Sequence, residues 1–288
     1  MMRADFTLTP IGGLGNRIYA ICSAITYCIQ QNKSLEIIWF KDYGLNCSVK
    51  DLFSINPELR NITLRDAKFT DYILNDNPRR RNLWIPSLFQ KFIYDRRIYS
   101  KEVYDVVSLR KNQDFGKIDN YKRIFMVSYY MFWRTPDMWK SIVINPEIKK
   151  HVDEFIVKFK GRKFIGIHIR RTDNKFSTEE SPTLLFIEKI REEIEKNQRD
   201  VMFYLASDSL EVKKELKNIF GDVIYTSMKE TSRNNKQGIL DAFIELNILA
   251  RTNKIYAPSN SSFSELAHFL LGADFEVLKK VKDDNKDI

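Results

Sequence analysis

Short apolar runs alternate with amphipathic stretches through the C-terminal half of the chain. The apolar runs cover residues 163–169, 201–206, 222–226 and 254–257, and helical patterns cover about 183–197, 209–219, 237–250 and 261–271. Apolar runs of this length between helical patterns are typical of strands that are buried on both faces of a parallel sheet. The pattern therefore predicts an α/β fold with helices on both faces of the sheet.

The N-terminal end of the chain shows the same rhythm once and then loses it. The pattern predicts a strand at 6–11, a glycine-rich turn at 12–15, a helix at 16–31 and a strand at 35–40. Residues 41–135 show only short helical patterns, and residues 136–162 predict a helix that bridges two halves of the chain. The length of the chain is enough for one large or two ordinary α/β domains, and we expect two, 1–140 and 141–288.

Positive charge is concentrated in one stretch of the sequence. The chain of 288 residues has a net charge of +9, and residues 78–112 hold nine Lys and Arg against three Asp and Glu. Such an excess indicates anionic partners, which include phosphates, nucleic acid and acidic membrane surfaces. Aromatic residues are interleaved with these charges, namely Trp84, Phe89, Phe92, Tyr94, Tyr99 and Tyr104.

Three interpretations of residues 78–112 stay open. Basic and aromatic side chains together could follow the phosphates and stack the bases of a nucleic acid, but we expect no nucleic-acid partner because the chain shows no nucleic-acid-binding motif. They could attach the protein to an anionic membrane surface, which would suit a lipid-linked sugar acceptor. They could also form a solvated, mostly helical face whose aromatic side chains turn inward.

Several functional classes are disfavoured by features that the sequence lacks. No apolar run approaches the length of a membrane-spanning helix, and residues 1–10 do not resemble a signal peptide, so we expect a cytoplasmic protein. Cys22, Cys28 and Cys47 do not have CxxC spacing, so neither a disulfide framework nor a zinc site is expected. The chain also lacks D-x-D, H-x-x-x-H and the P-loop pattern, so we expect no metal ion and no other cofactor.

A first polar cluster, from His168 to Asp173, follows the predicted strand 163–169. Ligands of open parallel sheets bind at the carboxyl ends of strands, which is where this cluster is expected. Strand alternation places His168 and Arg170 on one face and Arg171 on the other. Arg170 could form a bidentate pair with a phosphate and neutralise a departing diphosphate, or the cluster could be a surface ion-pair set.

A second polar cluster, from Ser259 to Glu265, follows the predicted strand 254–257. Ser262 and Glu265 have the spacing of a capping box, so the cluster predicts the start of a helix. A helix N-terminus ringed by hydroxyls is suited to an anion. An ordinary well-capped helix is the alternative.

The glycine-rich turn from Gly12 to Arg17 falls short of a dinucleotide-binding fingerprint, because Ile18 occupies the place of its third glycine. Asn16 in this turn could fix a sugar or a phosphate, or could cap the helix that follows.

Two acidic residues of the C-terminal half are further candidates for the site. Asp208 and Asp241 could each be an acid favoured near a helix start, whereas Asp241 in a pocket could accept two N–H groups of a guanine.

Five motifs together resemble those of the fucosyltransferases that use GDP-fucose. HIRRTD (168–173) is similar to the H-x-R-R-T-D of the alpha-1,6-fucosyltransferases and differs by one residue from the H-x-R-R-G-D of the alpha-1,2 enzymes. GGLGNR (12–17) is similar to the G-G-L-G-N-Q of the alpha-1,2 family and the G-x-x-G-N-Q of the protein O-fucosyltransferases. SNSSFSELA (259–267) resembles the S-N-S-S-F-S-W-W-A of the alpha-1,2 family. LASDS (205–209) and GILDAF (238–243) occur in the matching order.

The resemblance implies a GT-B-like fold, in which two Rossmann-like halves face each other across a cleft. Residues 1–140 would then form the acceptor side, and residues 141–288 would bind the donor nucleotide. It further implies metal-independent, inverting transfer of fucose from GDP-fucose to a glycan acceptor, with alpha-1,2 or alpha-1,6 linkage. The alternatives are a glycosyltransferase with another sugar nucleotide, a basic nucleic-acid-binding protein and a non-catalytic sugar- or nucleotide-binding module.

The resemblance also implies roles for the residues at matching positions. Arg170 would hold the β-phosphate and assist the departure of GDP, Asp241 would read guanine, and Asn16 would line the cleft from the other half. The predicted donor-binding set is Asn16, His168, Arg171, Asp208, Asp241, Ser261, Ser262 and Phe263.

An inverting transferase also needs a base that takes the proton of the acceptor. Glu179 is the first candidate and Asp173 the second, and Glu179 could instead be an ordinary acid that precedes the helix at Pro182. The motif departs from the alpha-1,6 family here. That family has Lys after R-R-T-D where this chain has Asn174, and its acceptor-activating Glu aligns with Thr178, or with Glu179 after a one-residue insertion.

Overall fold

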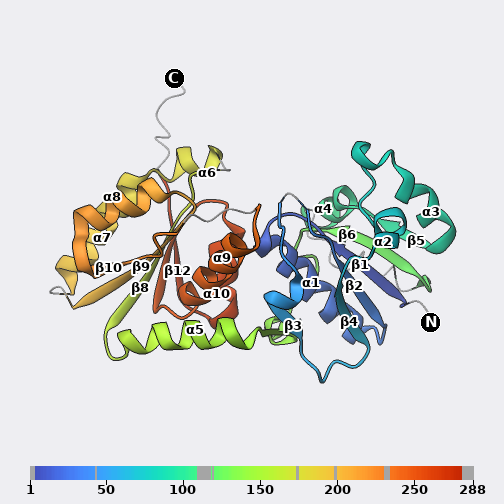
Figure 1. The fold of residues 1–288 in the computed structure, drawn as a ribbon, viewed down its shortest axis with the longest axis horizontal. Helices are drawn as coiled ribbons and strands as arrows, with labels where there is room; N and C mark the ends of the chain where they lie inside the picture. Colours follow the sequence, from blue (N-terminus) through green and yellow to red (C-terminus); the bar gives the residue numbers. More distant parts are fainter. Residues whose placement is uncertain are drawn as a thin grey trace. The chain divides into compact units, whose positions relative to one another are not determined.

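The computed structural model describes residues 4–42, 44–108, 118, 120–172, 175–197, 200–229 and 234–280. The chain divides into two compact units, of which unit 1 comprises Met1–Pro146 with Arg233–Lys236 and unit 2 comprises Glu147–Ser232 with Gln237–Ile288. Each unit contains a five-stranded sheet with helices around it (Figure 1). The predicted α/β class is confirmed, and both sheets are parallel and Rossmann-like. The arrangement of the two halves stays a prediction.

The sheet of unit 1 has the strand order β4-β2-β1-β6-β5. Its strands are β1 (Phe6–Pro10), β2 (Leu35–Trp39), β4 (Ile62–Asp66), β5 (Arg96–Ile98) and β6 (Ile124–Ser128), and a separate antiparallel pair joins β3 (Phe53–Ile55) to β7 (Ile142–Ile144). The central strand β1 pairs in parallel with β2 and β6, and all of its residues are buried. Strands buried in this way need cover on both faces.

The helices of unit 1 are α1 (Leu14–Gln30), α2 (Phe69–Leu74), α3 (Ile85–Ile93) and α4 (Ser100–Ser108), with single 3₁₀ turns at Val49–Asp51, Arg80–Asn82 and Met138–Ser141. Helix α1 is buried along most of its length, which fits a helix that is apolar nearly all round. Gly12 adopts a left-handed conformation (φ +85°) in the turn that leads from β1 into α1. Glycine is favoured there because a Cβ would strain this backbone.

The sheet of unit 2 has the strand order β10-β9-β8-β11-β12, and all of its strands are parallel. The strands are β8 (Lys163–Ile169), β9 (Val201–Ser207), β10 (Ile224–Tyr225), β11 (Lys254–Pro258) and β12 (Asp274–Leu278). The helices are α5 (Pro146–Ile156), α6 (Lys175–Glu180), α7 (Thr183–Lys196), α8 (Leu210–Phe220), α9 (Lys236–Leu249) and α10 (Ser262–Leu271), with 3₁₀ turns at Val157–Phe159 and Gly221–Val223.

Alternate residues of β8 and β9 face the two helical layers of unit 2. Ile165 and Phe203 belong to a buried cluster formed with α7 and α8 on one face of the sheet (Figure 1). On the opposite face, a Cβ added to Gly166 would lie 2.8 Å from Leu249 Cδ2 and 2.9 Å from Thr252 Oγ1. The end of α9 therefore packs directly against β8, and this close approach requires glycine.

The predicted strands and helices of the C-terminal half, and the first strand–helix–strand of the N-terminal half, are confirmed with shifts of a few residues. The predicted helix over 136–162 is partly wrong, because strand β7 precedes α5 there. The β-branched run Ile142–Ile144 pairs with β3, and Pro146 then occupies a helix start.

The interpretation that aromatic side chains of residues 78–112 turn inward is wrong for most of them. Tyr94 is buried, and Tyr99 is half-buried. The other aromatic residues of the stretch are exposed to solvent, namely Trp84, Phe89, Phe92 and Tyr104.

In the described part of the chain, no helix is both long and apolar enough to cross a membrane.

Candidate active site

The strand order of unit 2 reverses between β8 and β11. From β8 the chain continues to β9 and β10 on one side, whereas β11 and β12 lie on the other. Ligands of open α/β sheets bind outside the carboxyl ends of the strands at such a reversal. Both polar clusters predicted from the sequence emerge here, since His168 is near the end of β8 and Ser259 directly follows β11.

His168 ties the end of β8 to the first turn of α10. Its ring is buried, and Nδ1 lies 3.1 Å from the hydroxyl oxygen of Ser264 and 3.3 Å from that of Ser261. The ring of Phe263 is 5.0 Å from that of His168, centroid to centroid. The structure thus brings together His168, Ser261 and Phe263 of the predicted donor-binding set. Ser264, which is outside that set, joins them.

Helix α10 begins with Ser261 as its N-cap, one residue before the predicted cap Ser262. The predicted capping position is wrong because Ser262 is already the first helical residue. The hydroxyl of Ser261, at the N-cap, faces His168 and makes no cap hydrogen bond. An N-terminus without this cap can direct first-turn N–H groups and the positive end of its dipole toward an anion. Ser262, the first helical residue, is half-buried at this end of α10.

Arg171 holds the segment after β8 in place. Its guanidinium donates to the Thr183 hydroxyl at 3.1 and 3.0 Å and to the backbone oxygens of Ser181 and Arg170 at 2.9 and 2.8 Å. Partial burial lowers its pKa from the ordinary arginine value, against the opposing effect of the Asp208 carboxylate. These contacts give Arg171 a positioning role, and its predicted contact with the donor stays a prediction.

Asp208 binds the backbone that carries the cluster. Its carboxylate accepts the N–H of Arg171 at 2.7 Å, and the N–H and hydroxyl of Thr172 at 3.1 and 2.7 Å. The residue follows β9, whose last residue pairs with Ile169 at the end of β8. One carboxylate thereby fixes the loop of the neighbouring strand.

Replacing Asp208 by alanine is expected to loosen this loop. The two backbone N–H groups would lose a charge-assisted acceptor, so we expect the free energy of unfolding to fall by about 1–3 kcal/mol. Urea unfolding measures the change, and the exposed Asp200 replaced by alanine is the control. Equal stability of the two variants would show that the loop keeps its conformation without Asp208.

Asp241 is buried near the start of α9. Its carboxylate accepts from Gln237 Nε2 at 3.0 Å, and the ammonium of Lys229 lies 3.5 Å away. The pKa of Tyr204 on β9 is raised by burial first and by the negative charges of Glu245 and Asp241 second. The described contacts do not join Asp241 to the His168 cluster, and its contact with guanine stays a prediction.

The structure describes two of the three predicted catalytic residues, Arg170 and Glu179. Arg170 directly follows β8 and is half-buried, and its backbone oxygen lies 3.5 Å from the Thr178 hydroxyl of α6. Glu179 is exposed on α6, one residue beyond Thr178. Asp173 lies outside the described residues. Arg170 thus lies just after the end of β8, two residues from His168, while the catalytic roles stay predictions.

The hydroxyl of Ser181, which was not anticipated from the sequence, contacts the backbone of the second polar cluster. The N–H of Ser259 donates to the Ser181 hydroxyl at 3.0 Å. Ser259 Oγ is buried, and among the described residues it finds no hydrogen-bond partner. The sequence signal was weak, because Ser181 is far from Ser259 along the chain and precedes an ordinary Pro182. Within the described part of the chain, no group of His, Cys, Asp and Glu is arranged to hold a metal ion.

Asn16 lies in the first turn of α1 in unit 1. Gly13 is the N-cap of this helix, so the interpretation of Asn16 as its cap is wrong. Asn16 packs beside Gly12, where its side chain would be 3.4 Å from an added Cβ. It is half-exposed and, within the described residues, makes no side-chain hydrogen bond.

Arg17, the next residue, is completely buried under the same turn. Its guanidinium donates to the backbone oxygens of Gly12 and Phe40 at 2.9 and 2.6 Å and to the Asp42 carboxylate at 2.8 Å. The guanidinium carbon also lies 4.8 Å from the centroid of the Trp39 ring. Arg17 therefore joins the loops that follow β1 and β2.

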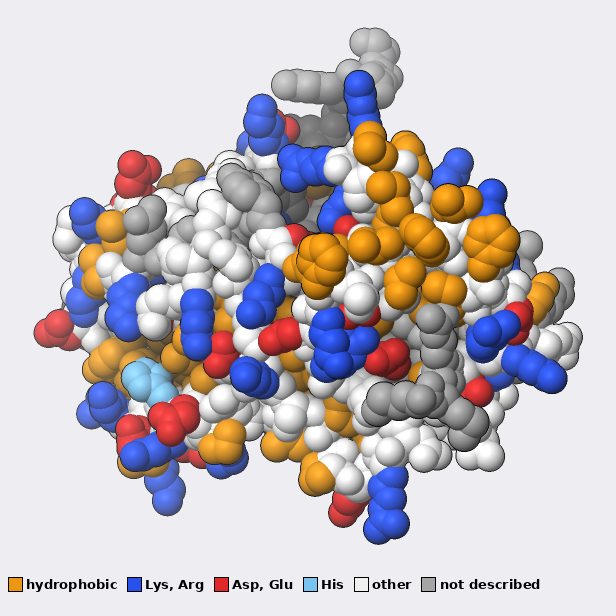
Figure 2. All heavy atoms as spheres, turned by 45° about the vertical axis from the view of Figure 1, so that its right-hand side comes forward, with side chains coloured by type: hydrophobic (Ala, Val, Ile, Leu, Met, Phe, Trp, Pro, Cys, Tyr) orange, Lys and Arg blue, Asp and Glu red, His pale blue; other side chains and the backbone are white. Residues whose placement is uncertain are grey.

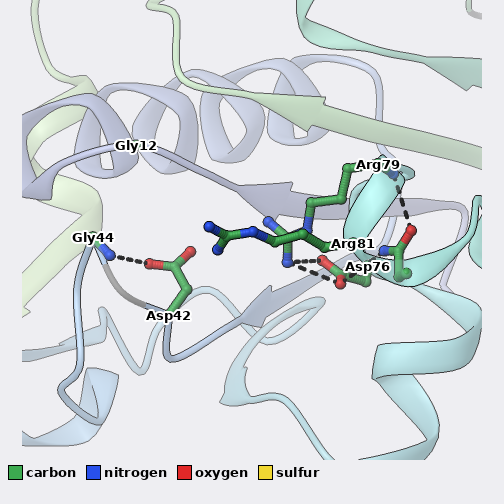
Figure 3. A pocket seen from close by; sticks show the side chains of 7 residues that line it. Gly12, Asp42, Gly44, Asp76, Arg79 and Arg81 are labelled. Atoms are coloured by element: carbon green, nitrogen blue, oxygen red, sulfur yellow. Dashed lines mark hydrogen bonds and ion pairs between the residues drawn. The ribbon is translucent and has the colours of Figure 1, made fainter.

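A pocket of about 410 Å³ opens beside these loops in unit 1 (Figure 3). Its lining comprises Gly12, Asp42, Gly44, Asp76, Arg79, Arg81 and Asn82. Arg79 points to Asp76 and forms an ion pair with it at 3.0 Å, whereas Arg81 extends toward Asp42. No carboxylate of the described residues pairs with Arg81, so the pocket offers one guanidinium to an anionic or hydroxyl-rich group.

Comparison with known proteins shows a likeness in fold. No protein-family model matches the sequence, and no curated protein matches it. The solved structure of the NodZ alpha-1,6-fucosyltransferase soaked with GDP-fucose is similar, with 17% identity and a TM-score of 0.63 over 93% of each chain. Fucosyltransferase NodZ from Bradyrhizobium matches with 16% identity and a TM-score of 0.62 over 94% of each chain.

A second kind of fucosyltransferase has a related structure. POFUT1 in complex with GDP-fucose is 9% identical, with a TM-score of 0.56, over 95% of this chain and 97% of that one. The chain therefore has the α/β fold of fucosyltransferases whose structures contain GDP-fucose. The resemblance inferred from the five motifs is confirmed at the level of the fold.

Proposed function

We propose that the protein is an inverting glycosyltransferase that transfers fucose from GDP-fucose to a glycan acceptor without a metal ion. The observation that carries this proposal is the position of Arg170 and the His168–Ser261–Ser264 group at the strand-order reversal of unit 2. A diphosphate at this place would meet a guanidinium and a helix N-terminus. The fold shared with fucosyltransferases supports the same donor.

In the proposed reaction, the bond between the sugar C1 and the phosphate oxygen breaks, and GDP leaves with the electron pair. The transition state has positive charge on the sugar and growing negative charge on the diphosphate. Arg170 would stabilise that negative charge, and the first turn of α10 would add its N–H groups. His168 would hold the end of β8 next to the start of α10, so that Arg170 and the first-turn N–H groups both reach the diphosphate.

The acceptor hydroxyl attacks C1 from the opposite side and must give up its proton to a base. Glu179 is exposed on α6, close in sequence to Thr178, which approaches the backbone of Arg170. Either Glu179 or Asp173 would take the proton and become a neutral carboxylic acid. The Glu179→Gln variant, assayed for GDP release with and without acceptor, separates these candidates, because loss of transfer alone would assign the base to Glu179.

Calorimetric titration in EDTA tests the donor. We expect binding of GDP and GDP-fucose, weaker binding of GDP-mannose, and none of UDP-N-acetylglucosamine. Retained GDP binding in EDTA would support metal-independent recognition. Binding of the uridine nucleotide alone, or of no nucleotide, would refute the fucosyltransferase proposal.

Replacing Asp241 by asparagine is expected to weaken recognition of guanine. A carboxylate can accept both the ring N–H and the amino group of the base, whereas an amide offers one acceptor and opposes the second donor. We expect GDP to bind about 1–3 kcal/mol less tightly. Calorimetry with GDP and with inosine diphosphate, which lacks the amino group, measures the effect.

The matched control for this variant is Asp222→Asn, because Asp222 is fully exposed in the same unit. The preference for GDP over inosine diphosphate should shrink in Asp241→Asn and persist in the control. An equal loss of affinity for both nucleotides would show that Asp241 supports the fold of α9 and does not read the base.

A further inference from the structure

Helix α3 of unit 1 exposes its apolar stripe to solvent and buries a polar residue on the opposite side. Ile85, Leu88, Phe89 and Phe92 follow the spacing of one helical stripe, yet all four are exposed, Phe92 by 80%. On the opposite side, the polar Gln90 is 0% exposed. Burial of the apolar stripe in this unit therefore does not hold the helix in place.

Hydrogen bonds of Gln90, together with packing of Pro86 and Ile93, fix the inner side of α3 instead. Gln90 Nε2 donates to the backbone oxygen of Asp76 at 2.9 Å, and the Tyr99 hydroxyl donates to Gln90 Oε1 at 2.7 Å. A buried amide with both ends bonded is a well-satisfied polar group. The helix is thus anchored on its inner side, and its apolar stripe remains outside.

The turn before α3 displays two more apolar side chains at a conformational cost. Leu83 and Trp84 both have left-handed backbones, with φ of +50° and +58°, and both side chains are largely exposed. Each such residue costs roughly 1–2 kcal/mol relative to a right-handed backbone. The backbone N–H groups of Leu83 and Trp84 bond to the oxygens of Arg80 and Arg79, which maintains the turn.

Helix α2 extends the same apolar surface. It packs beside α3, and Phe69, Tyr72 and Ile73 on it are exposed. Figure 2 shows a group of hydrophobic side chains on this face of unit 1, with lysine and arginine side chains around it. We call this surface the α2–α3 face, and it comprises Phe69, Tyr72, Ile73, Leu83, Trp84, Ile85, Leu88, Phe89 and Phe92. Apolar patches of this extent on a protein surface are typical of interaction sites.

The exposed charges within residues 67–94 are all positive. Lys68, Arg80, Arg81 and Lys91 are exposed. The two acidic residues of the segment are buried and paired, Asp71 with Arg65 and Asp76 with Arg79. An apolar centre with exposed lysine and arginine side chains beside it matches an anionic bilayer, whose headgroups attract lysine and arginine and whose acyl region accepts apolar side chains.

We propose that the α2–α3 face docks on the surface of an anionic lipid bilayer. Helix α3 lies in the interface with its apolar stripe in the acyl boundary, while Arg80 and Lys91 contact the headgroups. Trp84 occupies the boundary between them, where an amphipathic ring is favoured. This inference goes beyond the proposed transferase activity and does not rest on it.

Co-sedimentation with vesicles tests the proposal on the full chain. We expect binding to vesicles of phosphatidylcholine with phosphatidylglycerol, and at least about tenfold weaker binding to phosphatidylcholine alone. The Leu88→Ser, Phe92→Ser double variant should bind the anionic vesicles at least about tenfold less. The Arg80→Glu, Lys91→Glu double variant should bind less and should lose the preference for anionic lipid.

The matched control is Val157→Ser, Leu271→Ser, which removes two exposed apolar side chains from unit 2 and should leave binding unchanged. Trp84 supplies a second readout, because its fluorescence should shift to shorter wavelength on binding. The Trp84→Phe variant should bind but lose most of that shift, since the other tryptophans are Trp39, Trp133 and Trp139.

Two results would overturn the proposal. One is wild-type binding to neither vesicle, or binding that Leu88→Ser, Phe92→Ser does not reduce. The other is a wild-type dimer in sedimentation velocity that the same double variant converts to a monomer, because the α2–α3 face would then be covered by a second copy of the chain. Circular dichroism of each variant verifies that it remains folded.

Discussion

Arg170→Lys is expected to reduce the rate of fucosyl transfer at least about tenfold, which corresponds to about 1.4 kcal/mol in the activation free energy. Lysine keeps the positive charge but loses the planar fork that can bond two phosphate oxygens at once. Arg170→Ala removes the charge as well, and we expect a loss of about 10²-fold or more. Release of GDP from GDP-fucose, measured with saturating donor, gives both rates.

The effect of Arg170 on the rate of the chemical step can be separated from its effect on the affinity for GDP. Since Arg170 is proposed to act on charge that grows as GDP departs, the rate should fall more than the affinity for GDP. Arg191→Lys, an exposed position on α7, is the matched control and should change neither quantity. Near-normal turnover of Arg170→Lys would remove this residue from the mechanism, even if GDP still binds.

The elements that the sequence predicted well are those in which burial alone decides the pattern. Strands β8 and β9 are buried almost throughout and are flanked by amphipathic helices, so their apolar runs are visible. Strand β5 has three residues and contains Arg96 and Arg97, and a charged edge strand of this kind gives no apolar run. Strand β12 lies at the edge of its own sheet, where all of its residues are exposed or half-buried, and it was missed because it too gives no buried apolar run.

The site was predictable to the extent that it follows from topology. Strand ends of a parallel sheet meet at one edge, which is why His168 and Ser261 could be expected near each other. Side-chain partners across long sequence separations could not be read in this way. The carboxylate of Asp208 binds the backbone of Arg171, and no local pattern distinguishes it from an acid at a helix start.

The exposed apolar stripe of α3 shows most clearly what could not be predicted from the sequence. The periodicity of Ile85, Leu88 and Phe92 identifies an amphipathic helix, but periodicity cannot say which side faces the protein. That depends on the bonds of Gln90 to Asp76 and Tyr99, which are properties of the folded chain.

A buried ion pair links α8 to α9 in unit 2, one helical turn beyond Asp241. Lys213 Nζ lies 2.8 Å from Glu245 Oε1, and both side chains are almost completely buried. Burial raises the pKa of Glu245 to about 7 and outweighs the opposing effect of Lys213, while the carboxylates of Asp241 and Asp208 raise it further. The folded state therefore holds this proton more tightly than the unfolded chain. The stability that Glu245 contributes is present at low pH and is lost as the pH rises from about 4.5 to about 7.

Lys213→Met is expected to destabilise the protein by about 3–5 kcal/mol at about pH 8, because the buried Glu245 loses its cation and must either stay ionised without a partner or take up a proton. The loss should be smaller at about pH 5, where Glu245 is protonated and needs no partner. The Lys213→Met, Glu245→Leu double variant removes both charges. It should recover most of the stability and lose this pH dependence, since a well-packed apolar pair can replace a buried ion pair at little cost. Urea unfolding of the three proteins at both pH values measures the coupling. A single variant equally destabilised at the two pH values would show that Lys213 matters for packing rather than for the charge of Glu245.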